Sequence, residues 1–274
     1  MPRTLTIIGA GHLGQTLGHL WAVGGALRIQ DILNRTLAST EAAIAFIGTG
    51  CPASRITQLP HADIYLIATP DDQIAGSCAA LAASGNLSAT SIVFHCSGAL
   101  TSSVLDAASR AGAAVASVHP IRSFAQPRQA VANFAGTRCG VEGDLAALEV
   151  LSDCFTAIGA QFVPIKAEQK VLYHAAAVFA CNYLVTLQDV ALAMYAEAGI
   201  APDVALTMME PMVRATIDNI FNHGPAKALS GPIARGDTVT VEKHQEALAK
   251  LDPAYSELYR LFAELTTRLA GRTP

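Results

Sequence analysis

Two polar residues interrupt the most apolar long stretch of the chain. His174 and Asn182 lie eight residues apart between Ala167 and Ala198, a spacing that places them about 80° apart on one side of a regular α-helix. Histidine exchanges a proton near neutral pH because its ordinary pKa is about 6.5. Two interpretations stay open: a hydrogen-bonded pair inside a core, or a catalytic pair facing a cleft. Lys170, one turn earlier, is expected at the solvated end of the helix.

Three further polar residues have the chemistry to hold an anionic group. Ser97 follows an apolar run in "HCSGAL", and His119 precedes a proline in "SVHPIRSF", which restricts it to extended backbone. Arg235 comes just before a helix start in "GPIARGDTVTVEKH". Hydroxyl, imidazole and guanidinium groups all donate to carboxylate or phosphate oxygens. Ser97, His119 and Arg235 are therefore candidates for substrate binding, although Ser97 is also a typical helix cap and a lone His119 is also typical of a structural position.

A glycine pattern, "IIGAGHLG", lies between an apolar run and a helical segment near the start of the chain. Gly9 allows a tight turn, Gly11 lets the backbone approach a pyrophosphate, and Gly14 lets the helix pack on the strand. The amides of His12 and Leu13 then lie at a helix N-terminus, which favours a phosphate. The pattern predicts a dinucleotide site; the alternative is a glycine-rich turn that binds nothing.

The residues that follow the second apolar run indicate which dinucleotide binds. Asn34, Arg35 and Thr36 begin twenty residues after the last loop glycine. An acidic residue here accepts from the 2′-hydroxyl of NAD, whereas a basic one meets the 2′-phosphate of NADP. Arg35 favours NADP because its guanidinium is a planar fork of donors. Asp31 is the alternative residue for contact with the ribose, and its carboxylate would favour NAD.

The segment "ATPDDQI" follows another apolar run. Its residues Thr69, Pro70 and Asp71 are candidates for cofactor contact, because ligands of α/β folds bind beyond the carboxyl ends of the strands. The same residues also suit a helix start, with Asp71 or Asp72 as the cap and Pro70 fixing the entry of the chain. Both interpretations can hold together.

The elements that must position these residues form two domains. Up to about Pro164, short apolar runs alternate with helical segments, which predicts an α/β domain with a mainly parallel sheet, covered by helices on both faces. The predicted strands are Leu5–Ile8, Leu27–Leu33, Ile64–Ala68, Ile92–His95, Ala114–Val118, Arg138–Val141 and Gln161–Ile165. We therefore place an α/β domain at residues 1–164 and an all-α domain at residues 165–274.

The second half shows helical patterns and no strand pattern. Ala167–Ala198 is apolar on almost every face, so we expect it to be buried all round, within a bundle or against a second subunit. "GIAPD" then supplies a glycine cap and a proline for the next helix start. Further helices are predicted at Val204–Asn222, Thr238–Lys250 and Pro253–Leu269.

Composition excludes several classes of protein. The chain has 274 residues, of which 51% are hydrophobic and 15% charged, with a net charge of −4. No basic run suggests nucleic acid as a partner, and the N-terminus lacks a signal-peptide layout. Six scattered cysteines are typical of reduced thiols in a cytoplasmic protein. Polar residues in the long helix argue against a membrane span, and no histidines or cysteines recur at the spacing of a metal site.

Several motifs together resemble a bacterial family of uncharacterised NADP oxidoreductases, in which a Rossmann-like domain precedes a helical domain of unknown function. The motifs are "IIGAGHLG", "NRT", "ATPDDQI", "HCSGAL", "HPIRSF", "YHAAAVFACNYL" and "GPIARGDTVTVEKH". More distantly, the layout is similar to the 6-phosphogluconate-dehydrogenase-like superfamily, with its ketopantoate, pyrroline-5-carboxylate and β-hydroxyacid reductases. Ketopantoate reductases have Lys where this chain has His174, Asn where it has Val178, and Asn where it has Asn182.

The substrates of these relatives do not carry over to this chain, and our hypothesis is an NADP-dependent reductase of a small, anionic carbonyl or imine compound. It implies His174 as the proton donor, Asn182 as the residue that orients the substrate, and Ser97, His119 and Arg235 as ligands of its anionic group. It also implies a cytoplasmic homodimer joined through the helical domains, with the substrate between the two domains. A nucleotide-binding sensor without turnover and a methyltransferase are the alternatives, because both also use glycine loops.

Overall fold

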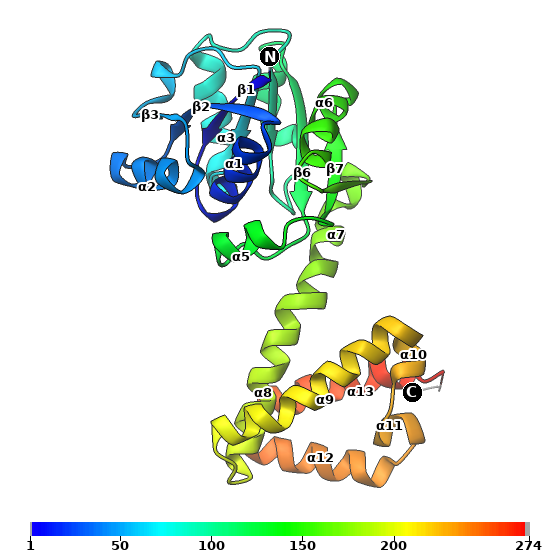
Figure 1. Ribbon diagram of the computed structural model, residues 1–274. Coiled ribbons are helices and arrows are strands. Elements are labelled where there is room, and N and C mark those ends of the chain that lie inside the picture. The colour runs from blue at the N-terminus through cyan, green and yellow to red at the C-terminus, as the bar shows by residue number, and fades with distance from the viewer. Residues whose placement is uncertain (1, 272–274) are drawn as a thin grey trace. The chain divides into compact units, whose positions relative to one another are not determined.

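The computed structural model describes residues 2–271. Contacts divide the chain into two compact units, Met1–Phe179 and Ala180–Pro274. The first is the α/β unit and the second is helical (Figure 1). The division falls later than the sequence suggests, because the helical segment that follows the last strand belongs with the first unit.

The first unit contains an eight-stranded sheet in the order β3-β2-β1-β4-β5-β6-β7-β8 within the described residues. Its strands are β1 Arg3–Ile8, β2 Leu27–Leu33, β3 Cys51–Ala53, β4 Ile64–Ile67, β5 Ile92–His95, β6 Ala114–Pro120, β7 Arg138–Gly143 and β8 Gln161–Pro164. Every neighbouring pair is parallel except β6 and β7, which run antiparallel. The predicted mainly parallel sheet is confirmed, and β3 is a strand that the sequence analysis missed.

Helices cover both faces of this sheet (Figure 1). The helices of this unit are α1 His12–Gly24, α2 Leu37–Ile47, α3 Asp71–Ala83, α4 Asp106–Arg110, α5 Pro127–Ala132, α6 Leu145–Thr156 and α7 Lys170–Ala177. Successive residues of a strand point to opposite faces; in β1, Ile7 packs with α1 and α6, whereas Ile8 packs with α3. Burial on both faces explains why the strands read as continuous apolar runs.

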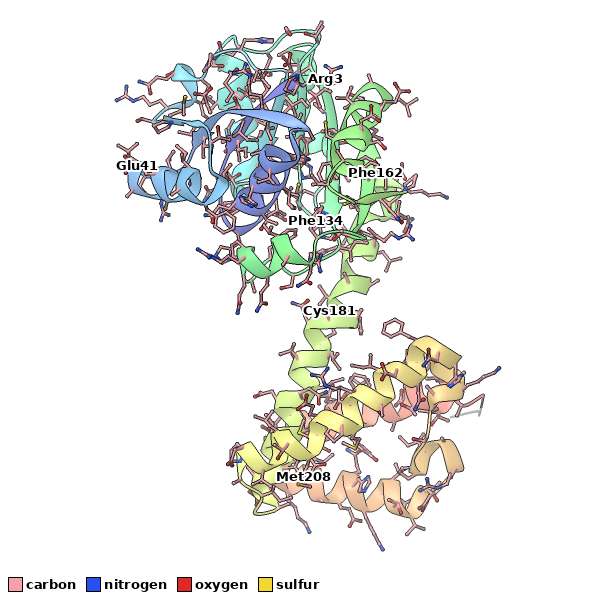
Figure 2. All side chains as sticks on the ribbon, viewed as in Figure 1. Arg3, Glu41, Phe134, Phe162, Cys181 and Met208 are labelled. Atoms are coloured by element: carbon pink, nitrogen blue, oxygen red, sulfur yellow. The ribbon has the colours of Figure 1, made fainter. Side chains whose placement is uncertain are left out.

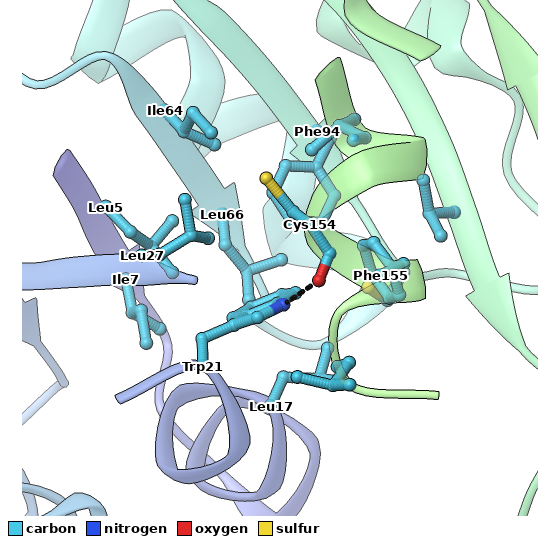
Figure 3. Packing of buried hydrophobic residues seen from close by; sticks show 14 of the residues in the cluster. Leu5, Ile7, Leu17, Trp21, Leu27, Ile64, Leu66, Phe94, Cys154 and Phe155 are labelled. Atoms are coloured by element: carbon cyan, nitrogen blue, oxygen red, sulfur yellow. Dashed lines mark hydrogen bonds between the residues drawn. The ribbon is translucent and has the colours of Figure 1, made fainter. Parts of the chain in front are cut away.

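Trp21 of α1 lies at the centre of the core on one face (Figure 3). The indole is fully buried, and its Nε1 donates a hydrogen bond of 2.9 Å to the carbonyl oxygen of Cys154 in α6. The rings of Phe155 and Phe94 pack edge-on against it, with centroids 5.1 and 6.4 Å away. This packing fixes α1, and with it the glycine loop, against the sheet.

The long apolar segment of the sequence is not one regular α-helix. A 3-10 turn at Ala167–Gln169 leads into α7, and a π-helical turn at Val178–Asn182 separates α7 from α8, Tyr183–Glu197. A π turn changes the angle between residues before and after it. The predicted 80° separation of His174 and Asn182 therefore does not hold.

The second unit is helical throughout its described part, as predicted. After α8 it contains α9 Pro202–His223, α10 Pro225–Ala228, α11 Pro232–Arg235, α12 Thr238–Leu251 and α13 Pro253–Leu269. Gly199 adopts φ +83° and Pro202 begins α9, as the "GIAPD" motif predicts.

The long helix is largely exposed within the single chain. Side chains stand out from it in Figure 2, where Cys181 is labelled, and Val185 of α8 is 70% exposed. Only 6% of its most apolar 18-residue window is buried. A bundle within one chain therefore does not supply the burial that its sequence predicts.

Candidate functional site

The glycine loop has the geometry that a dinucleotide requires. Gly9 adopts φ +89°, and a Cβ there would lie 2.6 Å from the amide nitrogen of Thr69. A Cβ at Gly14 would lie 3.1 Å from the carbonyl oxygen of Gly9, so this glycine lets α1 approach the strand. A Cβ at Gly11 would meet no atom within 4 Å, so open space lies beside the backbone there.

The N-terminus of α1 faces this open space. Gly11 is the residue before the helix, and no side chain caps it. His12 and Leu13 begin the helix and line a neighbouring cavity. Unpaired amides and the helix dipole make such a terminus favourable for a phosphate group.

Two cavities of the first unit adjoin the loop. The Arg35 cavity has a volume of about 440 Å³ and is lined by Gly9, Ala10, Gly11, Gln15, Asn34, Arg35, Thr36, Ser39, Ala42, Ala68, Thr69, Pro70 and Gln73. The Ser97 cavity has a volume of about 340 Å³ and is lined by Gly11, His12, Leu13, Ile67, Ala68, Thr69, Pro70, Asp71, Ile74, Cys96 and Ser97. Gly11 and Ala68–Pro70 line both, so the two cavities meet there.

Asn34 and Thr36 brace the Arg35 cavity. Oδ1 of Asn34 accepts from the amide of Ala10 at 2.6 Å, and its Nδ2 donates to the carbonyl oxygen of Ser39 at 2.8 Å. Thr36 caps α2 by accepting from the amide of Ser39 at 3.2 Å. Arg35 is exposed and has no hydrogen bond or ion pair in the part of the chain that the structure describes. Its guanidinium is the group left to bind a ligand.

Asp31 lies inside β2 and does not line either cavity. Its side chain is 8% exposed, and Oδ2 has no hydrogen-bond partner among the described residues. Burial raises the pKa of this carboxyl. The strand continues to Leu33, so Arg35 rather than Asp31 follows its carboxyl end.

Thr69 supplies a buried polar atom at the junction of the two cavities. Its Oγ1 has no hydrogen-bond partner among the described residues, although it is shielded from solvent. Buried hydroxyls are normally hydrogen-bonded, so this atom suits a ligand that passes from one cavity to the other. Together with the space at Gly11, it shows that the residues present fit a dinucleotide.

Ser97 forms several hydrogen bonds at the Ser97 cavity. Its Oγ donates to Oδ2 of Asp71 at 2.7 Å and accepts from the amides of Ala99 and Leu100 at 3.2 and 3.0 Å. Asp71 lies in the first turn of α3, after Pro70, and no side chain caps that helix. The hydroxyl of Ser97 is therefore already engaged in holding the loop, which is its structural interpretation; its role in substrate binding stays a prediction.

His95, which the sequence analysis did not single out, holds the loop that contains Ser97 by hydrogen bonds. Its side chain is fully buried. Nδ1 accepts from the amide of Ser97 at 3.1 Å, and Nε2 lies 3.1 Å from the carbonyl oxygen of Thr101. Burial, with the nearby charge of Lys170, lowers the pKa of His95 to about 4, so the ring is neutral at pH 7.

His119 and His174 meet next to Gly98, at the carboxyl ends of β5 and β6. Their ring centroids lie 6.0 Å apart. A Cβ at Gly98 would overlap Cδ2 of His174 and lie 2.9 Å from Nε2 of His119. The hydroxyl of Tyr173 lies 2.9 Å from Nδ1 of His119. The first unit therefore brings together two of the predicted residues and adds Tyr173, which the sequence analysis missed.

The charge states of this group differ from those of free side chains. Burial, with His174 and Lys170 nearby, lowers the pKa of His119 to about 4. Burial raises the pKa of Tyr173 to about 12. His119 and Tyr173 are both neutral at pH 7 and act there as hydrogen-bonding groups.

Lys170 is not at a solvated helix end, and that prediction is wrong. Its side chain is fully buried, and Nζ lies 2.8 Å from Oε1 of Glu142 in β7 while also donating to Ser117 of β6. Glu142 further accepts from the amide and hydroxyl of Ser102 at 2.8 and 2.7 Å. Burial would raise the pKa of Glu142, but the hydrogen bonds from Lys170 and Ser102 lower it overall. The ion pair fixes the start of α7 to the sheet.

The remaining predicted residues, Asn182 and Arg235, belong to the second unit. Asn182 ends the π-helical turn, and Arg235 is the last residue of α11. Asp237 caps α12 by accepting from the amide of Thr240 at 3.1 Å.

Among the described residues, no group of three or more His, Cys, Asp or Glu side chains is arranged to hold a metal ion. One helical run in the described part, Ala167–Glu197, is long and apolar enough to cross a membrane, with a mean hydropathy of 1.4 in its window. Length and composition alone are weak evidence for a span. This run also includes Lys170, whose ammonium group is paired within the first unit.

Several solved structures are similar to the chain over almost its whole length. A putative NADP oxidoreductase from Bacteroides fragilis has a TM-score of 0.79 at 20% identity, covering 97% of this chain and 98% of that one. A protein from Thermotoga maritima has a TM-score of 0.77 at 26% identity, with coverages of 97% and 98%. A pyrroline-5-carboxylate reductase from Coxiella burnetii has a TM-score of 0.59 at 15% identity, covering 99% and 98%.

Family models match both parts of the sequence, whereas no curated protein matches it. Residues 2–120 match a Rossmann-like domain, and residues 137–266 match DUF2520, a domain of unknown function. The second match begins one residue before β7, so this domain includes the last strands of the sheet as well as the helices. The resemblance drawn from the motifs is confirmed: in this chain a Rossmann-like domain is followed by a DUF2520 domain.

Proposed function

We propose that the protein is an NADP-dependent oxidoreductase acting on a small, anionic carbonyl or imine compound. The observation that carries this proposal is the pair of cavities that meet at Gly11 and Thr69. One contains the free guanidinium of Arg35, and the other ends at Asp71 and Ser97. The similar structures include a putative NADP oxidoreductase and a pyrroline-5-carboxylate reductase, which supports the same class of reaction.

The cofactor would be held by residues of the first unit. The amides at the start of α1 suit the pyrophosphate, and Arg35 suits the 2′-phosphate of NADP. Asn34 and Thr36 position the loop that carries Arg35. Asp31, the residue that would favour NAD, does not line the cavity, so NADP is the preferred cofactor in this proposal.

Bound nicotinamide would supply or accept a hydride at a carbon of the substrate. In the reducing direction, His174 donates a proton to the oxygen or nitrogen atom that gains negative charge. His119 is neutral at pH 7 because its pKa lies at about 4, so it binds the substrate as a hydrogen-bonding group and not as a cation. Ser97, Asn182 and Arg235 keep their proposed roles, with Arg235 supplying the positive charge for the anionic group.

The assembly that we propose is a homodimer joined through the helical unit. Large apolar side chains of this unit are exposed within one chain, including Val185 at 70% and Phe221 at 85%. Exposed apolar side chains of this kind mark an interaction site where they form a contiguous patch. All six cysteines are free thiols, which supports a reducing, cytoplasmic location.

Ligand-dependent thermal unfolding tests the proposal against its two alternatives. A ligand that binds the native state raises the apparent stability, so NADPH should raise the melting temperature more than NADH or S-adenosylmethionine does. Oxidation of NADPH is then followed with a panel of small keto acids and cyclic imines, in the wild type and in His174→Ala. Binding of NADPH without turnover of any member supports the sensor, and selective binding of S-adenosylmethionine contradicts the proposal.

A further inference from the structure

Tyr173 and His119 form a close pair beside the proposed substrate group. The phenol hydroxyl lies 2.9 Å from Nδ1 of the imidazole. The two rings are perpendicular, with centroids 5.7 Å apart and an interplanar angle of 89°. Tyr173 comes from α7 and His119 from β6, so the docking of α7 creates the contact.

The fold makes room for this pair at two glycines. Gly140 of β7 lies opposite His119 in the antiparallel ladder, and a Cβ there would lie 2.6 Å from Cζ of Tyr173 and overlap its hydroxyl. On the other side of the imidazole, a Cβ at Gly98 would lie 2.9 Å from Nε2 and Cε1 of His119. Any larger residue at either position would displace a ring.

The hydrogen bonds indicate where the imidazole proton lies. Tyr173 keeps its phenol proton at neutral pH, since burial raises its pKa to about 12. Among residues 2–271, Nδ1 of His119 is the acceptor that the structure provides for that proton. Leaving a hydroxyl proton without an acceptor is unfavourable where water is partly excluded. The phenol therefore donates to Nδ1, which leaves the single imidazole proton on Nε2.

Nε2 of His119 is the ring nitrogen that the contact with Tyr173 leaves available. It lies next to Gly98, whose neighbour Ser97 lines the Ser97 cavity, and it is directed to the same side as the ring of His174. Within the described residues it has no hydrogen-bond partner. A neutral N–H group in this position can donate to an oxygen atom, whereas a protonated iminium nitrogen has no lone pair with which to accept.

We propose that Tyr173 is a positioning residue that holds His119 as its neutral Nε2–H tautomer, so that this N–H donates to a carbonyl or carboxylate oxygen of the substrate next to Gly98. The identity of the acceptor rests on the proposed function. The tautomer does not, because it follows from the contacts of Tyr173, His119 and Gly140 alone.

Nitrogen NMR of the full-length protein labelled with ¹⁵N-histidine tests the tautomer directly. The His119 signals are assigned by their loss in His119→Gln. At pH 7 the wild type should show a protonated Nε2 and an unprotonated Nδ1. Tyr173→Phe removes the donor to Nδ1 and should abolish this fixed pattern, giving a mixture of tautomers. The same spectra, recorded over a range of pH, follow the protonation of His119. Its titratable neighbours are His174, Lys170 and Asp71.

The chain contains a matched control for this experiment. Tyr259 and His244 of the second unit form a pair with the same hydroxyl-to-Nδ1 distance of 2.9 Å and ring centroids 5.8 Å apart. Tyr259→Phe should leave the His119 signals unchanged. An Nδ1–H tautomer or a doubly protonated ring in the wild type would overturn the proposal, even if Tyr173→Phe does not fold. Unchanged His119 signals in a folded Tyr173→Phe protein would overturn it as well.

These NMR outcomes separate the proposal from the proposed enzyme activity. If NADPH and substrates give no turnover but the Nε2–H pattern depends on Tyr173, only the proposed function fails. If turnover is found, Tyr173→Phe should raise KM for substrates with a carbonyl or carboxylate oxygen by about tenfold. A change of this size corresponds to the loss of one hydrogen bond. NADPH affinity should stay unchanged.

Discussion

Nζ of Lys170 lies 2.8 Å from Oε1 of Glu142, and their side chains are 0% and 7% exposed. The pair joins the first residue of α7 to β7 and is completed by hydrogen bonds to Ser117 and Ser102. Tyr173 and His174 follow within one turn of the same helix. The positions of Tyr173 and His174 beside His119 therefore depend on this buried ion pair.

Replacing Lys170 by Met should strongly destabilise the protein. The change leaves the Glu142 carboxylate buried without its cation, and breaking a buried pair in this way costs about 3–5 kcal/mol. Urea unfolding followed by circular dichroism measures the loss. Arg214→Ala, which removes an exposed pair with Glu210, is the matched control and should change the unfolding midpoint little. Equal effects of the two variants would contradict the importance of the buried pair.

The sheet could be predicted from sequence because its strands are buried on both faces. Such strands have continuous apolar runs, and the predicted Leu27–Leu33 and Ile92–His95 agree with β2 and β5 residue for residue. The missed β3 has three residues, of which Cys51 and Pro52 are exposed. A strand that short at a sheet edge has no periodicity to detect.

The contacts of α7 were beyond sequence reasoning, because they depend on how the helix docks. Nothing local to Lys170 distinguishes a buried ammonium group from a solvated one. The available signal was Glu142, an acidic residue within an apolar strand, since a buried carboxylate needs a cationic or hydrogen-bonding partner. The π-helical turn at Val178–Asn182 likewise has no sequence pattern that separates it from the α-helix around it.

Stability should fall as the pH is lowered from about 6.5 to 4, because of His95. The folded pKa of about 4 lies below the ordinary value of 6.5, so the unfolded chain binds the proton first. The stabilisation is present above pH 6.5 and is lost as the pH falls toward 4. From the linkage relation, the contribution of His95 to the free energy of unfolding should be about 2 kcal/mol smaller at pH 5 than at pH 7.

Urea unfolding at a series of pH values, in the wild type and in His95→Gln, measures this dependence. The glutamine variant retains a polar side chain but has no titration in this range, so its stability should vary less between pH 7 and pH 5. Parallel pH profiles for the two proteins would show that His95 does not titrate with a lowered pKa.

Arg35→Ala should separate the two nicotinamide cofactors. Loss of a charge-assisted hydrogen bond to the 2′-phosphate costs about 1.5–3 kcal/mol, which is roughly a 10- to 150-fold weaker binding of NADPH. NADH lacks this phosphate, so its affinity should stay the same. Calorimetric titration measures both, and Arg28→Ala, which alters an exposed arginine on β2 outside the cavity, is the control. Equal losses for NADPH and NADH would remove Arg35 from the cofactor site.

Val185→Glu should weaken the proposed dimer. Val185 is 70% exposed on α8, and a carboxylate transferred into an apolar interface would be buried without a partner. Sedimentation analysis should show a dimer for the wild type and more monomer for the variant. Val23→Glu changes a 74% exposed valine of the first unit and should leave the assembly unchanged. A wild-type monomer at all protein concentrations would contradict the proposed assembly.

Gly98→Ala should reduce turnover while leaving the fold and the cofactor site intact. The added methyl group would overlap the ring of His174 and press on that of His119, so the rings must rotate away from their present places. The displaced atoms belong to side chains, so the backbone should stay in place. We therefore expect a loss in kcat/KM on the order of 100-fold, which should exceed the change in NADPH affinity. Gly76→Ala is the matched control, since no atom lies within 4 Å of a Cβ there. Within helix α3 the extra methyl group should raise stability by about 0.5–1 kcal/mol. If Gly98→Ala turned over substrate as fast as Gly76→Ala, the two imidazoles beside Gly98 would not be part of the active site.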